Sequence, residues 1–207
     1  MKKLLLPCFL LLLISISYSC KSEEPPAGPE SHNPPMLNLS VVDLNKVVEV
    51  KAYGDIIEPR IKRSAIRYFV NDALAQVKSV SVGVVDSVVF NSDPNYTDYR
   101  VRIRPFKNSL WYVVYNHVAQ VKVKVGDAVA AGAVLGSVGT GDLVDLQVNK
   151  IVYESSGIKY ESTVCPSSLF HSSVMTAHDQ MATRLGTAIQ ICSSGSALPY
   201  YSEPWRE

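Results

Sequence analysis

Apolar and polar residues alternate with a period of two along most of the chain from Leu39 onward. The clearest segment is 99–104, in which a tyrosine, a valine and an isoleucine alternate with Arg100, Arg102 and Arg104. A period of two sends successive side chains to opposite faces of a β-strand, one face buried and the other exposed. The same pattern predicts strands over 79–90, 110–118, 121–125 and 143–153, and a hairpin turn at 155–157 that leads into 158–162.

Helical spacing is confined to one late segment. Methionine, histidine, alanine and leucine recur at intervals of three and four over 173–185, and Gly186 stands where a helix commonly ends. We therefore predict a helix there, with His178 as a packing residue. The segment 61–76 carries mixed signals, between a strand and a short turn. The predicted fold class is all-β, an antiparallel sandwich or barrel-like sheet with one short C-terminal helix.

The composition fits one folded domain with appendages. Of the 207 residues, 47% are hydrophobic and 19% are charged, so the chain can bury a core. The formal net charge is +1 and no basic cluster occurs, which excludes nucleic acid as the default partner. The row formed by Arg100, Arg102 and Arg104 has two interpretations: a site for a polyanion or, more commonly, a solvated face of the sheet.

The first 19 residues have the features of an export signal. Lys2 and Lys3 precede an apolar run over 4–16, which is shorter than the stretch of about 20 residues that a membrane-spanning helix needs. The sequence Ser-Tyr-Ser-Cys that ends at Cys20 resembles the bacterial lipobox, whose cysteine is acylated with palmitate or a similar chain. We expect Cys20 to anchor the mature chain to a membrane, and the proline-rich stretch 21–35 to be a tether. The alternative is a plain cleaved signal with Cys20 free or paired.

Two cysteines remain in the body of the mature chain, Cys165 and Cys192, which are an even pair in an oxidising compartment. They flank the predicted helix, so a disulfide between them would close a loop of about 27 residues and contribute on the order of 3 kcal/mol. Two buried thiols are the alternative.

Four motifs follow one another within the predicted strands: Trp111-Tyr-Val-Val-Tyr-Asn-His117, Val125-Gly-Asp-Ala-Val129, Gly132-Ala-Val-Leu-Gly136 and Val138-Gly-Thr-Gly141. In this order they resemble the M23 family of zinc metallopeptidases, the lysostaphin- or LytM-like endopeptidases of peptidoglycan. Biotinyl and lipoyl carrier domains share the second motif, but the chain lacks the modified lysine of their hairpin. The likeness covers about 67–170 and implies the antiparallel sheet of the M23 fold.

The family binds zinc through a His-x-x-x-Asp segment and the second His of a His-x-His strand, while two further histidines assist catalysis. By this resemblance His117 is a retained catalytic histidine, the His-x-His strand reads Asp145-Leu-Gln147, and the His-x-x-x-Asp segment best matches Arg67 and Asn71. Catalytic zinc needs three good donors and an open position. An arginine adds positive charge where a dication should bind. The resemblance therefore implies that Arg67, Asn71, Asp145 and Gln147 are degenerate ligand positions without a metal.

These readings divide the chain into a signal peptide over 1–19, an acylated cysteine and tether over 20–36, a degenerate M23-like β domain over 37–170, and a C-terminal helix and extension over 171–207. The leading hypothesis is a lipid-anchored bacterial envelope protein that binds peptidoglycan or regulates a cell-wall hydrolase. Attachment to the outer membrane or the cell surface is favoured over the inner membrane.

Two alternatives stay open. One is an active zinc metalloendopeptidase with re-sited ligands, for which His117, Asp145, His171 and His178 are the candidates. The other is a surface lipoprotein that binds host or matrix molecules. Zinc enters only under the first of these, so the leading hypothesis has no cofactor.

Overall fold

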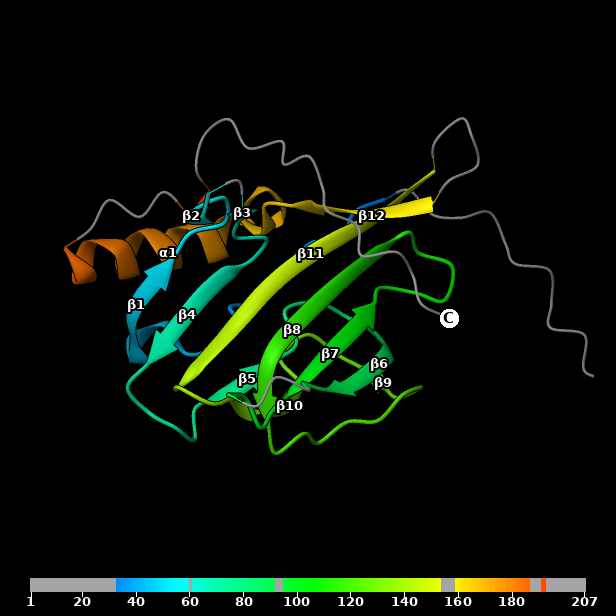
Figure 1. Ribbon diagram of the computed structural model, residues 1–207, viewed down its shortest axis with the longest axis horizontal. Coiled ribbons are helices and arrows are strands. Elements are labelled where there is room, and N and C mark those ends of the chain that lie inside the picture. The colour runs from blue at the N-terminus through cyan, green and yellow to red at the C-terminus, as the bar shows by residue number, and fades with distance from the viewer. Residues whose placement is uncertain (1–32, 60, 92–94, 154–158, 187–190, 193–207) are drawn as a thin grey trace, which may run out of the picture.

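The computed structural model describes residues 33–59, 61–91, 95–153, 159–186 and 191–192 (Figure 1). The predicted export signal, the acylation site Cys20, most of the tether and the hairpin turn at 155–157 lie outside the described residues. Within the described part of the chain, no helix is long and apolar enough to cross a bilayer.

Ten antiparallel strands form one curved sheet that makes up most of the fold (Figure 1). Its main path runs in the order β1, β4, β11, β8, β7, β6 and β9, while β12 pairs with β11 and β10 joins β8 to β5. These strands are β1 (Val47–Lys51), β4 (Ile66–Val70), β5 (Gln76–Lys78), β6 (Gly83–Phe90), β7 (Tyr99–Arg104), β8 (Trp111–Ala119), β9 (Ala128–Val129), β10 (Val134–Val138), β11 (Leu143–Tyr153) and β12 (Lys159–Val164).

Four smaller elements complete the described chain. They are the separate hairpin of β2 (Ile56–Glu58) and β3 (Ile61–Lys62), the 3-10 turns η1 (Leu44–Lys46) and η2 (Pro166–Leu169), and the helix α1 (Ser172–Leu185). The predicted fold class, a mainly antiparallel β fold with one late helix, is confirmed.

Two segments differ from their sequence pattern. The mixed signals over 61–76 resolve into β3, β4 and the first residue of β5. The strand predicted over 121–125 is wrong, because this segment is irregular backbone. Val121 and Val123 pack against the core, and the Lys122 backbone N–H donates to the Leu135 carbonyl at 2.8 Å. The alternation of apolar and polar residues here arises because the valines pack on the core, although the segment forms no β-strand.

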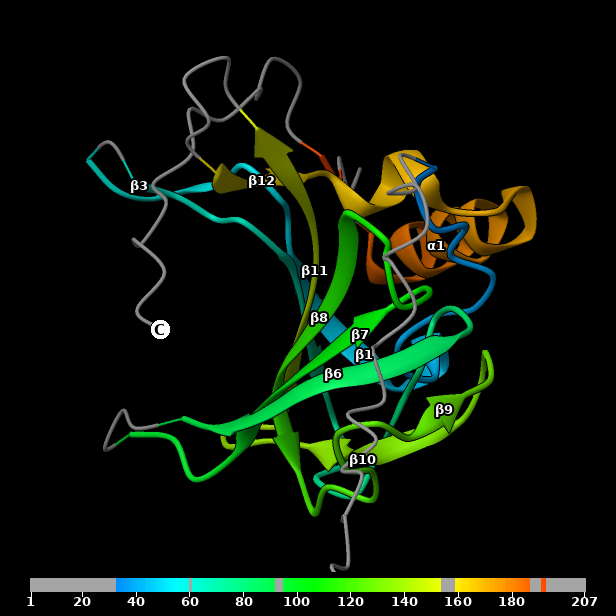
Figure 2. The same cartoon turned by 90° about the vertical axis from the view of Figure 1, so that its right-hand side faces the viewer.

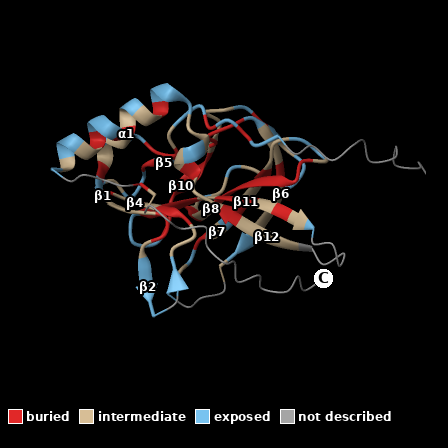
Figure 3. Cartoon of the chain, turned by 90° about the horizontal axis from the view of Figure 1, so that it is seen from above, coloured by how far each residue is buried: buried red, intermediate tan, exposed pale blue. Residues whose placement is uncertain are grey.

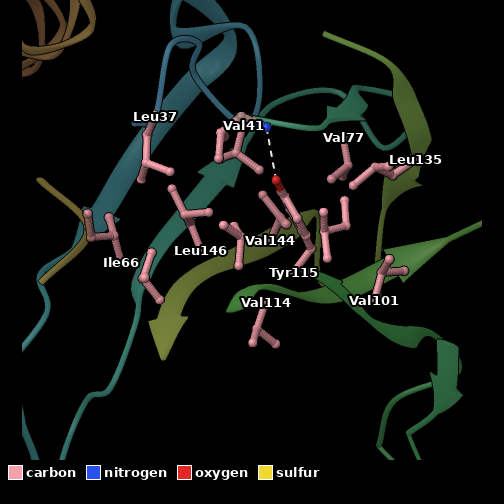
Figure 4. Close-up of a cluster of buried hydrophobic side chains, with 14 of the residues drawn as sticks. Leu37, Val41, Ile66, Val77, Val101, Val114, Tyr115, Leu135, Val144 and Leu146 are labelled. Carbon is pink, nitrogen blue, oxygen red and sulfur yellow. Dashed lines mark hydrogen bonds between the residues drawn. The ribbon is translucent and has the colours of Figure 1, made fainter. Parts of the chain in front are cut away.

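The core lies on one face of the central strands β4, β8 and β11. On β11, Val144, Leu146 and Val148 point into it and are at most 1% exposed. Figure 4 shows this cluster, which also includes Leu37, Val41, Ile66, Val77, Val101 and Leu135. The Tyr115 hydroxyl is buried among these side chains and accepts a hydrogen bond from the Val80 backbone N–H at 2.9 Å (Figure 4). The other face of β11 carries the polar residues Asp145, Gln147 and Asn149, which lie opposite Asn116, Val114 and Tyr112 of β8.

The helix α1 lies on one side of the sheet, and the β2–β3 hairpin projects on the other (Figure 2). His171 caps the helix start by accepting from the Ser173 N–H at 3.3 Å, and Gly186 ends the helix with a φ of 66°. His178 lies on the buried face of α1, where its Nδ1 contacts the Val174 carbonyl at 2.8 Å and its Nε2 contacts the Tyr68 hydroxyl at 3.0 Å. His178 is thus a packing residue, as the helical spacing predicts.

Cys165 and Cys192 form a disulfide with their Cα atoms 6.0 Å apart. The residues beside Cys192 run along Tyr53, whose backbone N–H donates to the Ile191 carbonyl at 3.0 Å. The bridge therefore ties the chain beyond α1 to the end of β12.

Candidate functional site

The alternation of β4 sorts two neighbouring residues to opposite faces of the sheet. Tyr68 points into the core beneath α1, where burial raises its pKa and its hydroxyl meets His178. Arg67 points to the other face. In the sheet register Arg67 lies directly opposite Asp145 of β11, and Asp145 lies opposite Asn116 of β8. The polar face is therefore built from the positions that alternate with the core positions.

Arg67 and Asp145 form a bidentate ion pair. Nε of Arg67 donates to Oδ1 of Asp145 at 2.7 Å, and Nη2 donates to Oδ2 at 2.8 Å. The side chains are 21% and 8% exposed, so the pair is largely shielded from water. The hydrogen bonds to Asp145 raise the pKa of Arg67, while burial acts in the opposite direction. Both oxygens of Asp145 are occupied by one fixed guanidinium.

His117 at the end of β8 is held between two carboxylates. Its Nδ1 lies 3.1 Å from Oδ2 of Asp98, and its Nε2 lies 3.4 Å from Nη2 of Arg67 and 3.8 Å from Oδ2 of Asp145. An ionised Asp98 only accepts hydrogen bonds, which makes Nδ1 the donor and leaves Nε2 to accept from Arg67. The ring of Tyr96 packs on the imidazole at 4.4 Å. His117 is only 7% exposed and has a φ of 62°, so its place is tightly defined.

Asp98 is fully buried and anchors this group. Its carboxylate accepts from the Thr140 backbone N–H at 3.1 Å and from the side-chain amide of Asn91. The glycine-rich loop over 138–141 lies against it: a Cβ on Gly139 would collide with the Asp98 carboxylate and come within 2.8 Å of the His117 backbone. Gly139 therefore permits the loop to close on the Asp98–His117 pair.

Gln147 belongs to a chain of hydrogen bonds along the same face. Its Oε1 accepts from Ser64 Oγ at 3.1 Å, and its Nε2 donates to Asn149 Oδ1 at 2.7 Å. Asn149 in turn donates to Glu161 at 2.6 Å, and Glu161 accepts from Arg102 at 2.6 Å. These groups form a continuous row of hydroxyl, amide and charged side chains from Ser64, just before β4, to Arg102 of β7.

Asn71 is not brought to this group. Its backbone N–H donates to the Lys46 carbonyl at 3.0 Å, and the residue is exposed. Asn71 lies four positions beyond Arg67 along extended backbone, a span of about 13 Å. The structure instead places Ser64 beside Gln147.

Three members of the site escape the sequence analysis: Ser64, Tyr96 and Asp98. Each lies outside the strands next to a segment with a clear pattern, and its contacts with Gln147 or His117 join distant parts of the chain. The one local sequence feature that points to this part of the site is the glycine-rich loop over 138–141, which lies against Asp98 and His117.

The arginine row of β7 is engaged within the protein. Arg100 donates to Asn116 at 2.8 Å. Arg102 and Arg104 stack on the ring of Tyr112 at 4.2 and 4.4 Å and pair with Glu161 and Asp86 respectively. These contacts favour a structural role over a polyanion site.

Residues 64–156 match the family model described as Peptidase family M23. These residues form an M23 family domain. Among solved structures, the M23 domain is similar to the catalytic domain of the prophage-encoded M23 protein EnpA from Enterococcus faecalis, with 24% identity over 50% of this chain and 81% of that one and a TM-score of 0.43.

Lysostaphin from Staphylococcus simulans is 20% identical over 65% of this chain and 52% of its own, with a TM-score of 0.46. Csd3 from Helicobacter pylori is 20% identical over 72% of this chain and 39% of its own, with a TM-score of 0.43. The chain thus spans about half the length of the lysostaphin structure. No curated protein matches the chain.

The M23 family is usually zinc-dependent, and the residues of this site do not fit that metal. In the described part of the chain, no three His, Cys, Asp or Glu residues gather into a group that would hold a metal ion. Asp145, whose Oδ2 lies 3.8 Å from Nε2 of His117, has both oxygens bound by Arg67. A guanidinium at that position repels a dication and supplies no donor lone pair.

The remaining histidines are also held elsewhere. His171 is the exposed cap of α1 and bonds to Ser173 at 2.8 Å. His178 lies on the core side of β4 against Tyr68, whereas His117 lies with Arg67 on the other face. The described residues therefore do not unite these histidines in one site. What the site offers is a fixed array of charges and hydrogen-bonding groups.

Proposed function

We propose that the M23 domain is catalytically inactive and acts by binding, either to peptidoglycan peptides or to a cell-wall hydrolase that cleaves them. The observation that carries this proposal is the bidentate Arg67–Asp145 pair beside His117. It puts a fixed cation where this family needs a metal. Hydrolysis without a metal would need another way to activate water, and His117 has both ring nitrogens engaged, Nδ1 with Asp98 and Nε2 with Arg67.

The polar face suits recognition of a peptide. Ser64 and Gln147 present a hydroxyl and an amide that are already aligned by their own hydrogen bonds, the Gln147 amide being held by the buried Asn149. Preorganised groups lose little conformational entropy when a ligand arrives, which favours binding. Peptide ligands carry amides and carboxylates that exchange hydrogen bonds with such groups.

We also propose that the chain is exported and anchored by an acylated Cys20, with the M23 domain held on the envelope by the tether. The support is the sequence: a basic start, a short apolar run and a cysteine at the cleavage point. Attachment to the outer membrane or cell surface would place the domain within reach of the wall or its hydrolases.

The test is co-sedimentation of the purified mature chain with peptidoglycan sacculi, followed by capture of partners from envelope extract. The expected result is enrichment of the wild-type chain on sacculi or of a wall hydrolase on the chain, with loss in a Ser64→Ala/Gln147→Ala variant. Thr176→Ala, on the exposed face of α1, is the matched control and should retain binding. No enrichment of wall or hydrolase would count against the proposal, and release of peptide fragments from the sacculi would contradict the inactive domain.

A further inference from the structure

A groove opens between α1 and the segment 39–45, on the core side of the sheet. Through His178, α1 contacts Tyr68 of β4, whereas the neighbouring Arg67 points to the polar face. The groove therefore lies on the opposite side of the sheet from His117. Its volume of about 510 Å³ falls within the range of roughly 300–1,000 Å³ that ligand sites have.

The M23 family match does not account for this groove. Its walls are the segment 39–45 and α1, both outside the matched residues 64–156. Among the described residues that line the groove, only Lys78 and Gly132 belong to the matched part. The groove is therefore formed where the flanking segments of this chain pack against the M23 domain.

Contacts between the two walls hold the groove in place. Nη2 of Arg184, near the end of α1, donates to the carbonyls of Leu44 at 2.8 Å and Val47 at 2.7 Å. Gly132 allows Leu39 to pack closely, because a Cβ at Gly132 would lie 3.1 Å from Cδ1 of Leu39. A groove that is formed before its ligand arrives loses little conformational entropy on binding.

Positive charge exceeds negative charge in the groove. Lys78 is half-buried, and its Nζ has no hydrogen-bond or ion-pair partner within the described residues. Arg184 bonds to neutral carbonyls through Nη2. Asp43 is the one carboxylate among the described lining residues; its Oδ1 accepts from the Asn45 backbone N–H at 3.0 Å, and it forms no ion pair with either cation. Two cations and one carboxylate favour a ligand that brings a negative charge.

Hydrogen-bonding groups and an exposed apolar side chain accompany these charges. Within the described part of the chain, the side chains of Ser40, Asn45 and Gln180 have no hydrogen-bond partner, and all three line the groove. A side-chain amide both donates and accepts, as the peptide group does. Leu39 also lines the groove and is 42% exposed. The groove thus combines groups that suit a peptide backbone with an apolar surface that suits one of its side chains.

We infer that this groove binds an extended acidic segment of a protein partner, with a carboxylate of the segment on Nζ of Lys78 and an aliphatic side chain on Leu39. The amides of Asn45 and Gln180, which are exposed, bond to the backbone of the segment. A charge-assisted hydrogen bond from Lys78 is stronger than a neutral one and selects the acidic side chain. A small inorganic anion would leave the amides and Leu39 without a contact. The groove is separate from the polar face, so this inference goes beyond the proposed function and does not depend on it.

The experiment compares two fluorescein-labelled peptides on the mature chain by fluorescence anisotropy: acetyl-Ser-Leu-Glu-Leu-Ser-amide and the same peptide with glutamine in place of glutamate. We expect the glutamate peptide to bind roughly tenfold tighter, because its carboxylate adds one charge-assisted hydrogen bond. Lys78→Gln should abolish this preference, and Lys78→Arg should retain it. Asn45→Ala/Gln180→Ala should weaken both peptides by a similar factor of about five, because the amides bind the backbone that the peptides share.

Lys62→Gln is the matched control, and it should keep the full preference. It removes an exposed lysine of β3 in the hairpin that projects on the side of the molecule away from α1 (Figure 3). Ser64→Ala/Gln147→Ala should also keep the preference, because these residues belong to the polar face. Thermal unfolding of each variant verifies that it is folded.

The outcomes separate this inference from the proposed function. Equal affinity for the two peptides, or a preference that survives Lys78→Gln, would overturn the inference and leave the proposed function standing. Lys78-dependent capture by vesicles of anionic phospholipid, with no preference between the peptides, would assign the groove to a membrane surface and overturn the inference. A preference that arises only after deletion of residues 193–207 would also overturn it, because the groove would then belong to the chain's own tail. A Lys78-dependent preference without binding to sacculi or a hydrolase would support the groove and contradict the proposed function.

Discussion

Arg67 of β4 and Asp145 of β11 face each other across the sheet and are joined by two hydrogen bonds of 2.7 and 2.8 Å. Their backbone register makes them direct neighbours, so the pair follows from strand pairing as much as from charge. Both oxygens of Asp145 are thus bound by a guanidinium, which offers no lone pair to a metal ion.

Removing one member of the pair should be costly. Arg67→Ala leaves the Asp145 carboxylate buried without its counter-charge, and we expect the free energy of unfolding to fall by on the order of 3 kcal/mol. Arg67→Met combined with Asp145→Leu removes both charges and should recover much of that loss. Urea unfolding of the two variants and the wild type measures both effects. If Arg67→Ala were as stable as the wild type, the ion pair would not be the buried, stabilising interaction that we describe.

His178 should make the protein less stable in mild acid. Burial lowers its pKa below the ordinary histidine value of 6.5, while the Val174 carbonyl and Asp179 act against the shift. The unfolded chain therefore binds a proton below about pH 6.5 that the folded chain resists, so the free energy of unfolding falls as the pH falls through that value. The loss approaches about 1.4 kcal/mol per pH unit. Between pH 7 and 5 the wild type should lose stability relative to His178→Gln, by at most about 1.4 kcal/mol for each pH unit, as measured by urea unfolding. Stabilities that change equally with pH in the two proteins would refute the assignment.

The Cys165–Cys192 disulfide should contribute to stability through the loop that it closes, with a sequence separation of 27 residues. Reduction, or the double variant Cys165→Ser/Cys192→Ser, should lower the free energy of unfolding by about 3 kcal/mol. Mass spectrometry after alkylation gives an independent measurement. Two alkylated thiols in the unfolded but unreduced chain would show that the bridge does not form in the mature protein.

Cys20 should carry the membrane anchor. In cells, the wild-type chain should partition into the detergent phase and carry fatty acyl groups by mass spectrometry, because several acyl chains together hold a protein on a bilayer. Cys20→Ser should move the chain to the aqueous phase without changing the M23 domain. Equal partitioning of both forms would exclude lipid anchoring at this residue.

Much of the sheet is predictable from alternation, and the reason is visible in β8 and β11. These strands bury one face so completely that a register slip would expose residues such as Val144 and Leu146, so the pattern in the sequence is strict. The strand predicted over 121–125 is not formed, because an alternating pattern alone does not supply a neighbouring strand to pair with. Val121 and Val123 pack on the core, but the hydrogen bonds of a strand come from partners that local sequence does not reveal.

The site is predictable only in part. His117, Asp145 and Gln147 follow motifs with fixed spacing, and all three lie on the polar face. Arg67, which the resemblance also names, meets Asp145 through the register of β4 and β11, and no local pattern gives that register. Ser64 and Asp98 enter from loops, whose positions depend on the folded sheet, and Asn71 lies about four strand residues beyond Arg67, away from the group.

The most direct measurement of the central claim is the zinc content of the purified, tag-free mature chain after dialysis against trace zinc. The account predicts a stoichiometry near zero by elemental analysis, because Arg67 occupies Asp145 and His117 is locked between Asp98 and Arg67. Sacculi incubated with the same preparation should remain uncleaved. A stoichiometry near one, with cleavage that a chelator abolishes, would contradict the account and make this M23 domain an active metallopeptidase.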